Sequence, residues 1–267
     1  MTARGATEPA TTRSRHLFWL RELAVILAFY LVYTWVRNKF GSAAVGPDVA
    51  FNNAELMLDI EAAIGLDVED EIQSWFLDYG WFLRFWNIFY GTFHFLVTAF
   101  ALIYLYRTDR AAYPRWRTIG LTTTGIALIG FAIFPLMPPR LIGDCSIYGA
   151  CLASPFVDTV AEHGGWWTFG SGTMEQISNQ YAAMPSLHFA WAYWSFLVLA
   201  PRLQNRAALV FIWAYPWLTV FAIIVTGNHY WIDAVGGALV LALGYLIGNA
   251  IHDWWEGRRP SVAARAE

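Results

Sequence analysis

Six apolar stretches, each about as long as a membrane-spanning helix, constrain the fold of this chain more than any other feature. They cover approximately residues 18–36, 79–106, 118–137, 182–199, 207–226 and 230–251. A bilayer core of about 30 Å is crossed by roughly 20 apolar residues in a helix. Only 14% of the 267 residues are charged, which leaves too little polar surface for a soluble domain. We therefore predict an all-α integral membrane protein with six transmembrane helices.

Basic residues gather on one side of this six-span arrangement. Most of them precede the first stretch, fill the connections after the second and fourth stretches, or follow the last one. These are Arg4, Arg13, Arg15, Arg21, Arg107, Arg110, Arg115, Arg117, Arg202, Arg206, Arg258, Arg259 and Arg265. The other side holds Arg37, Lys39, Arg84 and Arg140. Because cytoplasmic loops carry the excess of arginine and lysine, we predict that both termini are cytoplasmic.

The spans also divide the chain into regions. We expect a polar cytoplasmic tail over residues 1–16, one membrane domain over 17–256 and a second cytoplasmic tail over 257–267. On the outer side we expect an interfacial segment over 48–78 and a long loop over 138–181. The near-exclusive use of arginine as the basic residue favours a bacterial genome, and hence the plasma membrane.

The outer segment over residues 48–78 has a helical pattern. Leu56, Ile60 and Ile64 repeat at helical spacing, which predicts short helices that lie in the plane of the outer interface. Asp67 is the expected N-cap of the second of these helices. The alternative is a solvated acidic face.

The only two cysteines, Cys145 and Cys151, lie close together in the outer loop. Outside the cytoplasm a disulfide can form, and an even pair in one short loop favours it. Two free thiols are the alternative. The chain has no Cys-x-x-Cys motif, so a zinc or redox site has no support in the cysteines.

A histidine and an aspartate, His229 and Asp233, stand four residues apart at the start of the last stretch. This spacing places both side chains on one helix face. The carboxylate can accept the Nδ1 proton of the imidazole, which leaves Nε2 free as a nucleophile or base. The alternative is a structural hydrogen bond.

A second histidine, His188, ends the motif Pro185-Ser186-Leu187-His188 at the start of the fourth stretch. Proline suits the first turn of a helix, where the free backbone N–H groups form an anion site. Ser186 can donate a further hydrogen bond to that anion, and His188 can pass a proton to a leaving group. The alternative is an ordinary interfacial helix start.

Arg140 is almost alone as a cation on the outer side, where it follows two prolines. Its guanidinium matches the oxygens of a phosphate. The alternative is snorkelling or pairing with lipid headgroups.

Along the second stretch, Arg84, Asn87, Gly91 and His94 recur at helical spacing, with Tyr90 beside them. They predict a cavity that binds a headgroup or an acceptor, or alternatively hydrogen bonds between helices.

Taken in order, these motifs resemble those of the type 2 phosphatidic acid phosphatase superfamily. The matching residues are the Pro-Pro-Arg ending at Arg140, the Pro-Ser-Leu-His ending at His188, and His229 with Asp233. The resemblance covers roughly residues 87–250, and it is closest to the inositolphosphotransferase branch, which includes inositol phosphorylceramide synthase. It implies six transmembrane helices and a lipid substrate.

The resemblance also implies a role for each matching residue. His229 would attack phosphorus to form a phosphohistidine, Asp233 would orient His229, and His188 would protonate the leaving oxygen. Arg140 and the backbone around Ser186 would hold the phosphoryl oxygens. Two positions depart from the superfamily pattern, because Ile133 and Ile223 stand where a lysine and an arginine are usual.

These features predict a membrane lipid phosphotransferase at the outer leaflet, which moves a phosphoryl or phospho-headgroup from a lipid phosphate or phospholipid to a lipid alcohol. The alternative activity is a lipid phosphate phosphatase that releases free phosphate. We expect no cofactor, no metal and no nucleic-acid partner, because the sequence has neither a carboxylate cluster nor a histidine-rich ligand set in these motifs.

A non-enzymatic membrane protein is the alternative from a different class. A transporter or a histidine-ligated haem protein would need His94, His188 and His229 at one depth in the bilayer. By helical rise, however, His94 lies about 20 Å along its stretch. We therefore expect His94 at a different depth from the other two histidines.

Overall fold

The computed structural model describes residues 46–145, 152, 154–165 and 181–258, together with single positions between residues 20 and 39. The regular elements in the continuous ranges are helices, apart from one isolated β-bridge between Leu136 and Ala182. They are α2 (Pro47–Ala63), α3 (Glu69–Ser74), α4 (Gly80–Thr108), α5 (Tyr113–Ile133), the 3-10 helix η1 (Pro139–Leu141), α7 (Thr159–His163), α9 (Leu187–Leu199), α10 (Arg206–Val225) and α11 (Trp231–Gly257). The prediction of an all-helical protein is confirmed over these ranges. The predicted tails lie wholly or largely outside them.

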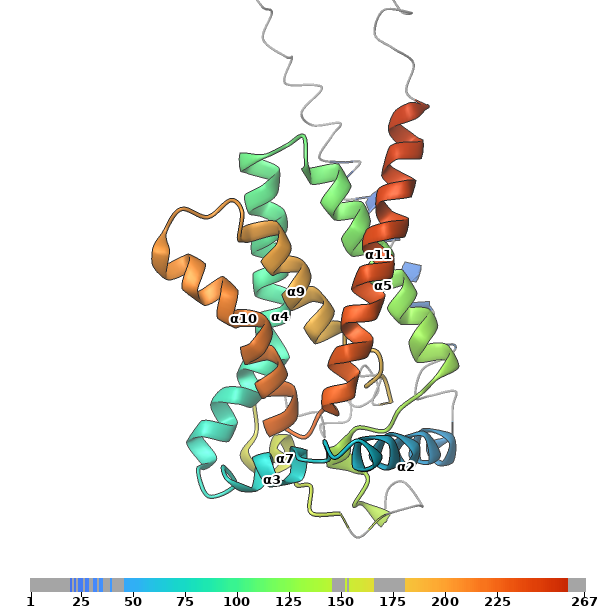
Figure 1. Cartoon of the computed structure of the whole chain (residues 1–267), viewed down its shortest axis with the longest axis vertical. Coiled ribbons are helices and arrows are strands. Elements are labelled where there is room, and N and C mark those ends of the chain that lie inside the picture. The colour runs from blue at the N-terminus through green and yellow to red at the C-terminus, as the bar shows by residue number, and fades with distance from the viewer. Residues whose placement is uncertain are drawn as a thin grey trace, which may run out of the picture.

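Four helices, α4, α5, α10 and α11, form a bundle around α9 (Figure 1). α9 packs against α4, α5, α10 and α11, and α5 packs along α11. The helices α4, α5, α10 and α11 are long and apolar enough to cross a membrane, whereas α9 is an apolar helix of 13 residues. Large apolar side chains such as Trp217 and Ile133 point outward from the bundle. These helices mark a membrane protein, while the full set of six spans stays a prediction.

In two predicted spans, several residues that were expected to be helical are not. The third was expected over residues 118–137, but α5 ends at Ile133 and Phe134 has non-helical backbone angles. Pro135 explains this end, because the residue before a proline is disfavoured in the helical region. The fourth was expected from residue 182, but α9 begins only at Leu187. The segment before α9 is instead non-helical, and the Leu136–Ala182 bridge pairs it with the chain that follows α5.

α5 and α11 approach each other closely at two glycines of α11. A Cβ atom at Gly244 would lie 2.1 Å from Oγ1 of Thr123, and one at Gly248 would lie 2.8 Å from the Cα atom of Ile119. Only residues without a side chain fit there, and such close contacts are how membrane helices gain packing energy.

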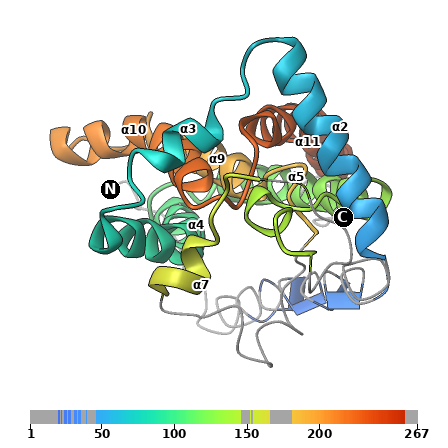
Figure 2. The same cartoon turned by 90° about the horizontal axis from the view of Figure 1, so that it is seen from below.

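α2 and α3 lie across one end of the bundle, with α2 nearly perpendicular to the long helices (Figures 1 and 2). α2 buries Ala50, Ala54 and Met57 in a cluster with Met137 and Tyr230. The expected short helices over residues 48–78 are therefore present.

Asp67, however, does not cap α3. The N-cap residue is Val68, and no side chain caps this helix. Asp67 was expected there because aspartate is a favoured N-cap residue and precedes Asp70 and Glu71, but residue type alone did not locate the start of the helix. The helix begins instead at Glu69, whose carboxylate turns inward to the start of α11.

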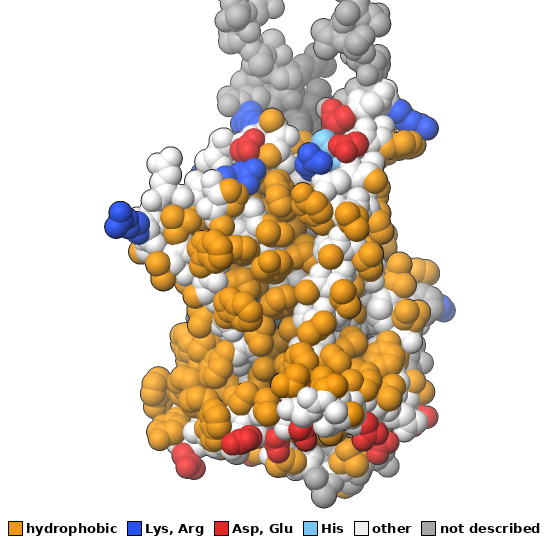
Figure 3. Space-filling model, in the orientation of Figure 1, with side chains coloured by type: hydrophobic (Ala, Val, Ile, Leu, Met, Phe, Trp, Pro, Cys, Tyr) orange, Lys and Arg blue, Asp and Glu red, His pale blue; other side chains and the backbone are white. Residues whose placement is uncertain are grey.

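Basic and acidic side chains are distributed unevenly along the bundle (Figure 3). On the face shown, basic side chains appear at the upper end together with a few acidic ones, while the lower end shows acidic side chains below an apolar belt. The upper end carries the α4–α5 and α9–α10 connections, with Arg110 and Arg202 among their residues. The lower end carries α2 and α3.

One described residue of the predicted first span contacts the upper end. The buried Glu22 pairs with Arg117 at the start of α5 and accepts a hydrogen bond from the hydroxyl of Tyr113 at 3.3 Å. Residue 22 is therefore at the opposite end of the bundle from α2, as the predicted span over 18–36 requires. Most of that span lies outside the described residues.

Candidate functional site

His229 and Asp233 form a buried pair at the start of α11. The Nδ1 atom of His229 is 3.1 Å from Oδ2 of Asp233, and the two residues are 3% and 0% exposed. The same Oδ2 atom accepts the backbone N–H of Tyr230 at 3.1 Å, so Asp233 also caps the helix. One carboxylate therefore fixes both the imidazole and the backbone beside it. With Nδ1–H donated to Asp233, the lone pair of His229 is on Nε2.

His188 faces that lone pair. Nδ1 of His188 is 3.3 Å from Nε2 of His229, so His188 is the donor when Nε2 of His229 is the acceptor. The ring of Tyr90 stacks on His188 with a centroid distance of 4.2 Å and an interplanar angle of 23°. The ring of His94 meets His188 edge-on, with a centroid distance of 4.2 Å. The two aromatic contacts hold the His188 ring in line with His229.

The contact of His94 with His188 corrects an expectation from the sequence. His94 was expected at a different depth because it lies far along its helix. The prediction was wrong because it placed the start of α9 at the membrane surface. The non-helical residues 181–186 carry the chain inward before α9 begins at Leu187, so that its first turn meets the middle of α4. Nδ1 of His94 lies 2.9 Å from the carbonyl oxygen of Tyr90, within its own helix.

The start of α9 is tied to α11. Ser186 is the N-cap, and its hydroxyl oxygen accepts the N–H of Phe189 at 3.4 Å. The N–H of Ser186 donates to the carbonyl oxygen of Asp233 at 3.0 Å. The N–H groups of Leu187 and His188 have no acceptor among the residues that the structure describes, while the side chain of Leu187 packs into the core. This helix start therefore offers two backbone donors beside the histidines.

Arg140 is held against the turn that carries His229. Its backbone N–H donates to the carbonyl oxygen of Gly227 at 2.8 Å, and its Nε donates to Oδ1 of Asn228 at 3.0 Å. Gly227 has a φ of 65°, and a Cβ atom there would lie 3.3 Å from Cβ of Arg140. Glycine therefore suits this position for its backbone conformation and for the close approach of Arg140.

Asp158 also contacts Arg140. Its Oδ2 atom accepts a hydrogen bond from a terminal nitrogen of Arg140 at 2.6 Å, and its Oδ1 atom accepts the N–H groups of Val160 and Ala161 as the N-cap of α7. Neither Asp158 nor Asn228 was predicted from the sequence. An aspartate at the start of a short helix in an outer loop was the available signal for Asp158, and the position next to His229 was the signal for Asn228.

Asn87, one of the predicted substrate-binding residues, hydrogen-bonds Thr159 of α7 and Gly164, which follows this helix. Its amide nitrogen donates to the carbonyl oxygens of Thr159 and Gly164, both at 2.9 Å, and its amide oxygen accepts the hydroxyl of Thr159 at 2.9 Å. These bonds use the amide group to fix α7 on α4. Asn87 thereby supports the helix whose N-cap, Asp158, holds Arg140.

The structure describes only one of the two cysteines of the predicted disulfide. Cys145 is disulfide-bonded. Its expected partner, Cys151, lies outside the described residues.

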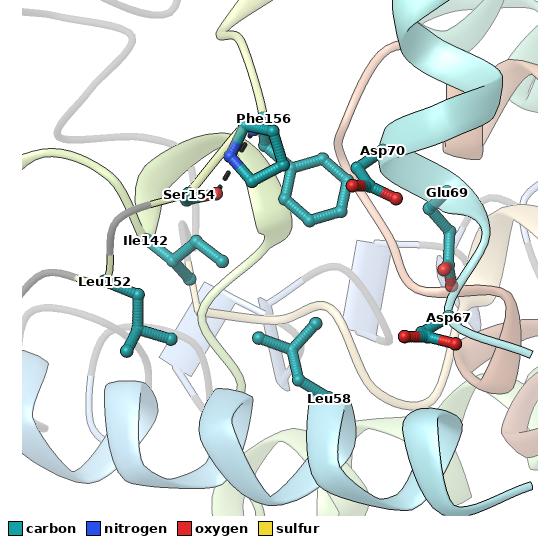
Figure 4. Close-up of a pocket in the computed structure, with 9 residues that line it drawn as sticks. Leu58, Asp67, Glu69, Asp70, Ile142, Leu152, Ser154 and Phe156 are labelled. Carbon is teal, nitrogen blue, oxygen red and sulfur yellow. Dashed lines mark hydrogen bonds between the residues drawn. The ribbon is translucent and has the colours of Figure 1, made fainter. Parts of the chain in front are cut away.

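Two hollows lie near these residues. A cavity of about 10 Å³ opens between α4, α9 and α10, where His94 and His188 are part of its wall; it has room for about one water molecule. A larger cleft of about 160 Å³ lies between α2, α3 and the chain that precedes α7 (Figure 4). Apolar Leu58 and Phe156 face acidic Asp67, Glu69 and Asp70 across this cleft.

Comparison with known protein families gave one finding. A family model described as the PAP2 superfamily matches residues 55–247, which is more than half of the chain. The matched range includes Arg140, His188, His229 and Asp233. No curated protein and no solved structure matches the chain.

Proposed function

The chain belongs to the PAP2 superfamily, and from this premise we propose that it is a membrane lipid phosphotransferase of the inositolphosphotransferase-like branch. Membership of this superfamily indicates an activity of the lipid phosphatase or phosphotransferase type on a lipid phosphate. The proposed reaction moves a phosphoryl or phospho-headgroup from a lipid to an alcohol through a phosphohistidine. It needs no metal and no cofactor.

The observation that carries this proposal is the line of three side chains formed by Asp233, His229 and His188. The distances along it are 3.1 Å from Oδ2 to Nδ1 and 3.3 Å from Nε2 to Nδ1. A carboxylate behind one imidazole makes the far nitrogen a better nucleophile. A second imidazole in front of that nitrogen can deliver a proton. His229 and His188 therefore place a nucleophile and a proton donor next to each other.

In the first step, Nε2 of His229 attacks phosphorus and the bond between phosphorus and the leaving oxygen breaks. His188, which enters the step protonated on both ring nitrogens, gives one proton to that oxygen and becomes neutral, so the first product leaves as a neutral alcohol. The electron pair of Nε2 forms the new phosphorus–nitrogen bond, and Asp233 stabilises the positive charge that develops on the His229 ring. The 3.3 Å contact leaves no room for phosphorus between the two nitrogens, so the substrate separates the imidazoles as it binds.

In the second step, the acceptor alcohol attacks phosphorus while His188 takes its proton. The phosphorus–nitrogen bond breaks and its electron pair returns to His229. When water replaces the alcohol, the product is free phosphate or a free phospho-headgroup. The acceptor alone thus separates transfer from hydrolysis.

The negative oxygens on phosphorus meet the groups around the two histidines. The guanidinium of Arg140 supplies positive charge, and the N–H groups of Leu187 and His188 supply donors at the positive end of the α9 dipole. Tyr90 and His94 hold the ring of His188. Such preorganised donors and charges stabilise the charge of the transition state without rearranging.

The proposed location is a bacterial plasma membrane, with the site facing outward. The α4–α5 and α9–α10 connections carry most of the basic residues of the described loops, whereas the histidines lie toward the end covered by α2 and α3. The positive-inside rule assigns the basic end to the cytoplasm.

The test compares purified protein with the variants His229→Ala and His252→Ala. His252 is a matched control, because its Nδ1 atom also contacts an aspartate, Asp253, at 3.2 Å, but at the far end of α11. Lipid phosphates and phospholipids would be supplied with candidate alcohols, with EDTA present throughout. Mass spectrometry would follow the lipid products, and a separate assay would measure free phosphate.

A headgroup that moves to the alcohol, in the parent and the His252→Ala variant only, is the expected result. Release of free phosphate without transfer would replace the transferase with a phosphatase. Turnover that survives His229→Ala would overturn the mechanism, and loss of turnover with EDTA would overturn its independence from metals.

A further inference from the structure

Two glutamates outside the proposed phosphate site meet at the start of α11. Glu61 lies near the end of α2 and Glu69 is the first residue of α3, and they are 0% and 2% exposed. Burial of a carboxylate is costly unless hydrogen bonds or a positive charge offset the lost water. Within the described part of the chain, neither glutamate pairs with a basic side chain. Their hydrogen bonds are therefore what offsets the burial.

Both glutamates bind backbone N–H groups of α11. Oε1 of Glu69 accepts the N–H of Trp231 at 3.0 Å, and Oε1 of Glu61 accepts the N–H of Ile232 at 3.2 Å. The first N–H groups of a helix have no partner within the helix, and the helix dipole favours negative charge there. Asp233 accepts the N–H of Tyr230 in the same way. Three consecutive N–H groups directly after His229 are thus each bound by a different carboxyl group.

The two glutamates also share a proton. Oε2 of Glu61 is buried and has no donor among the described residues, and the carboxyl group of Glu69 lies beside it. Two adjacent carboxylates repel each other unless one carries a proton. Burial, with the negative charge of Glu69 and a hydrogen bond to it as the next causes, raises the pKa of Glu61 to about 9. At neutral pH, Glu61 is therefore protonated and its O–H donates to Glu69.

We propose that Glu61 and Glu69 act as one acid pair, joined by a shared proton, that positions the backbone of His229 for its attack on phosphorus. This inference rests on the proposed function, in which His229 is the nucleophile. The pair contacts no reacting atom, and it acts through the N–H groups of Trp231 and Ile232. Glu61 and Glu69 are thus positioning residues.

The pair borders the larger cleft through Glu69. Glu69 is part of the wall of the 160 Å³ cleft, together with Asp67 and Asp70 (Figure 4), so the shared proton can exchange there. From α11 the pair faces Asp233, and the hydroxyl of Tyr230 lies near both glutamates. All these neighbours are acidic or weakly acidic. When the shared proton is lost at high pH, the carboxylates of Glu61, Glu69 and Asp233 therefore repel one another at the start of α11.

The first measurement is the pH dependence of kcat for the full-length protein and the variants Glu61→Gln, Glu61→Ala and Asp59→Asn. Asp59 is the matched control, because it is an exposed carboxylate on the same helix. In Glu61→Gln the side-chain amide still accepts from Ile232 and donates to Glu69, but it does not titrate. We expect kcat of the parent and of Asp59→Asn to fall as the pH rises through about 9, and kcat of Glu61→Gln to lack this fall. Glu61→Ala should lose about 10²-fold in kcat at neutral pH, with a smaller change in KM.

A second measurement does not depend on turnover. Amide hydrogen exchange over residues 229–233 should speed up in Glu61→Ala and stay at the parent rate in Glu61→Gln and Asp59→Asn at neutral pH. If the parent turned over no lipid but exchange still followed this pattern, the proposed function would be wrong. The hydrogen bonds from the acid pair to the backbone of α11 would still be supported. Equal exchange in all four proteins, or an alkaline fall in kcat that Glu61→Gln retains, would overturn the acid pair.

Discussion

The neighbours of Arg140 restrict the orientation of its guanidinium. Its Nε bonds Asn228 and one terminal nitrogen bonds Asp158, so the guanidinium is oriented before any phosphate arrives. A fixed fork gives more specificity than a mobile one, because less rotamer entropy is lost on binding. In many superfamily members two further cations are expected, but here those positions are Ile133, which is 76% exposed on the bundle surface, and Ile223, which is buried. The orientation of this single arginine therefore matters more.

Replacing Asp158 with asparagine tests that orientation. Asparagine still caps α7 well, so the change removes the charge opposite Arg140 and leaves the helix in place. We expect kcat/KM to fall by about 10- to 100-fold, equivalent to about 1.5–3 kcal/mol for one charge-assisted hydrogen bond. Steady-state kinetics on the identified lipid would measure it. Glu162→Gln, an exposed change on the same short helix, should leave the parent value, and equal losses in both variants would point to a disturbed loop.

For single residues, the sequence predicted a contact correctly where the spacing along one helix is enough to bring two side chains together. The i, i+4 pair of His229 and Asp233 could be predicted because one turn brings the two side chains together. The contacts of Asp158 with Arg140 could not, because they join a loop helix to a 3-10 helix through tertiary packing. Glu61 did leave a signal: it continues the buried stripe of Ala54 and Met57 on α2, where a carboxylate is out of place unless it has a partner.

At the scale of elements, the placement of α2 and α3 decides how α11 begins. Each contributes one glutamate to the first turn of α11, so the outer helices and the start of the last bundle helix form one unit. The sequence predicted short helices here but not their role, since either an interfacial or a solvated helix fits an acidic amphipathic pattern. Likewise the late start of α9 depends on residues 181–186, whose backbone pairs with the chain after α5. Apolar composition alone does not reveal that pairing.

Stability of this unit should depend on pH in a defined direction. The pKa of Glu61 is about 9 in the folded protein and near 4.5 for a free side chain. Between these values the unfolded chain has released the proton that the folded chain still holds, so the free energy of unfolding falls as the pH rises. Thermal unfolding in detergent from pH 5 to 9 should therefore show a declining melting temperature in the parent. The Glu61→Gln variant should decline less, whereas parallel curves for the two proteins would contradict the raised pKa.

At the scale of the whole molecule, the charge distribution and the position of the site agree. The basic connections are at one end and the acidic helices α2 and α3 are at the other (Figures 1 and 3). His188 and His229 lie between these ends, toward the acidic one. Composition and loop charges were enough to predict a membrane protein of this kind, because hydropathy and the positive-inside rule act on whole segments. The depth of the site could not be read in this way, because α9 starts inside the bundle.

The orientation can be tested with single cysteines. Asp59→Cys on α2 and Arg258→Cys just after α11 introduce thiols at opposite ends of the bundle. A membrane-impermeant thiol reagent added to intact cells should label the first variant and not the second, and permeabilised cells should allow both. The parent provides the background from its own cysteines. Labelling of Arg258→Cys alone in intact cells would invert the proposed topology and place the site in the cytoplasm.

The central claim is that His229 carries the transferred group, and trapping the intermediate tests it most directly. The parent, His229→Ala and His252→Ala would each be mixed with the identified lipid labelled with ³²P at its phosphate, then quenched in alkali, where phosphohistidine survives. We predict a labelled protein in the parent and in His252→Ala, with the label on the peptide that contains residue 229, and none in His229→Ala. Label that persists in His229→Ala, or that maps to another residue, would contradict the account.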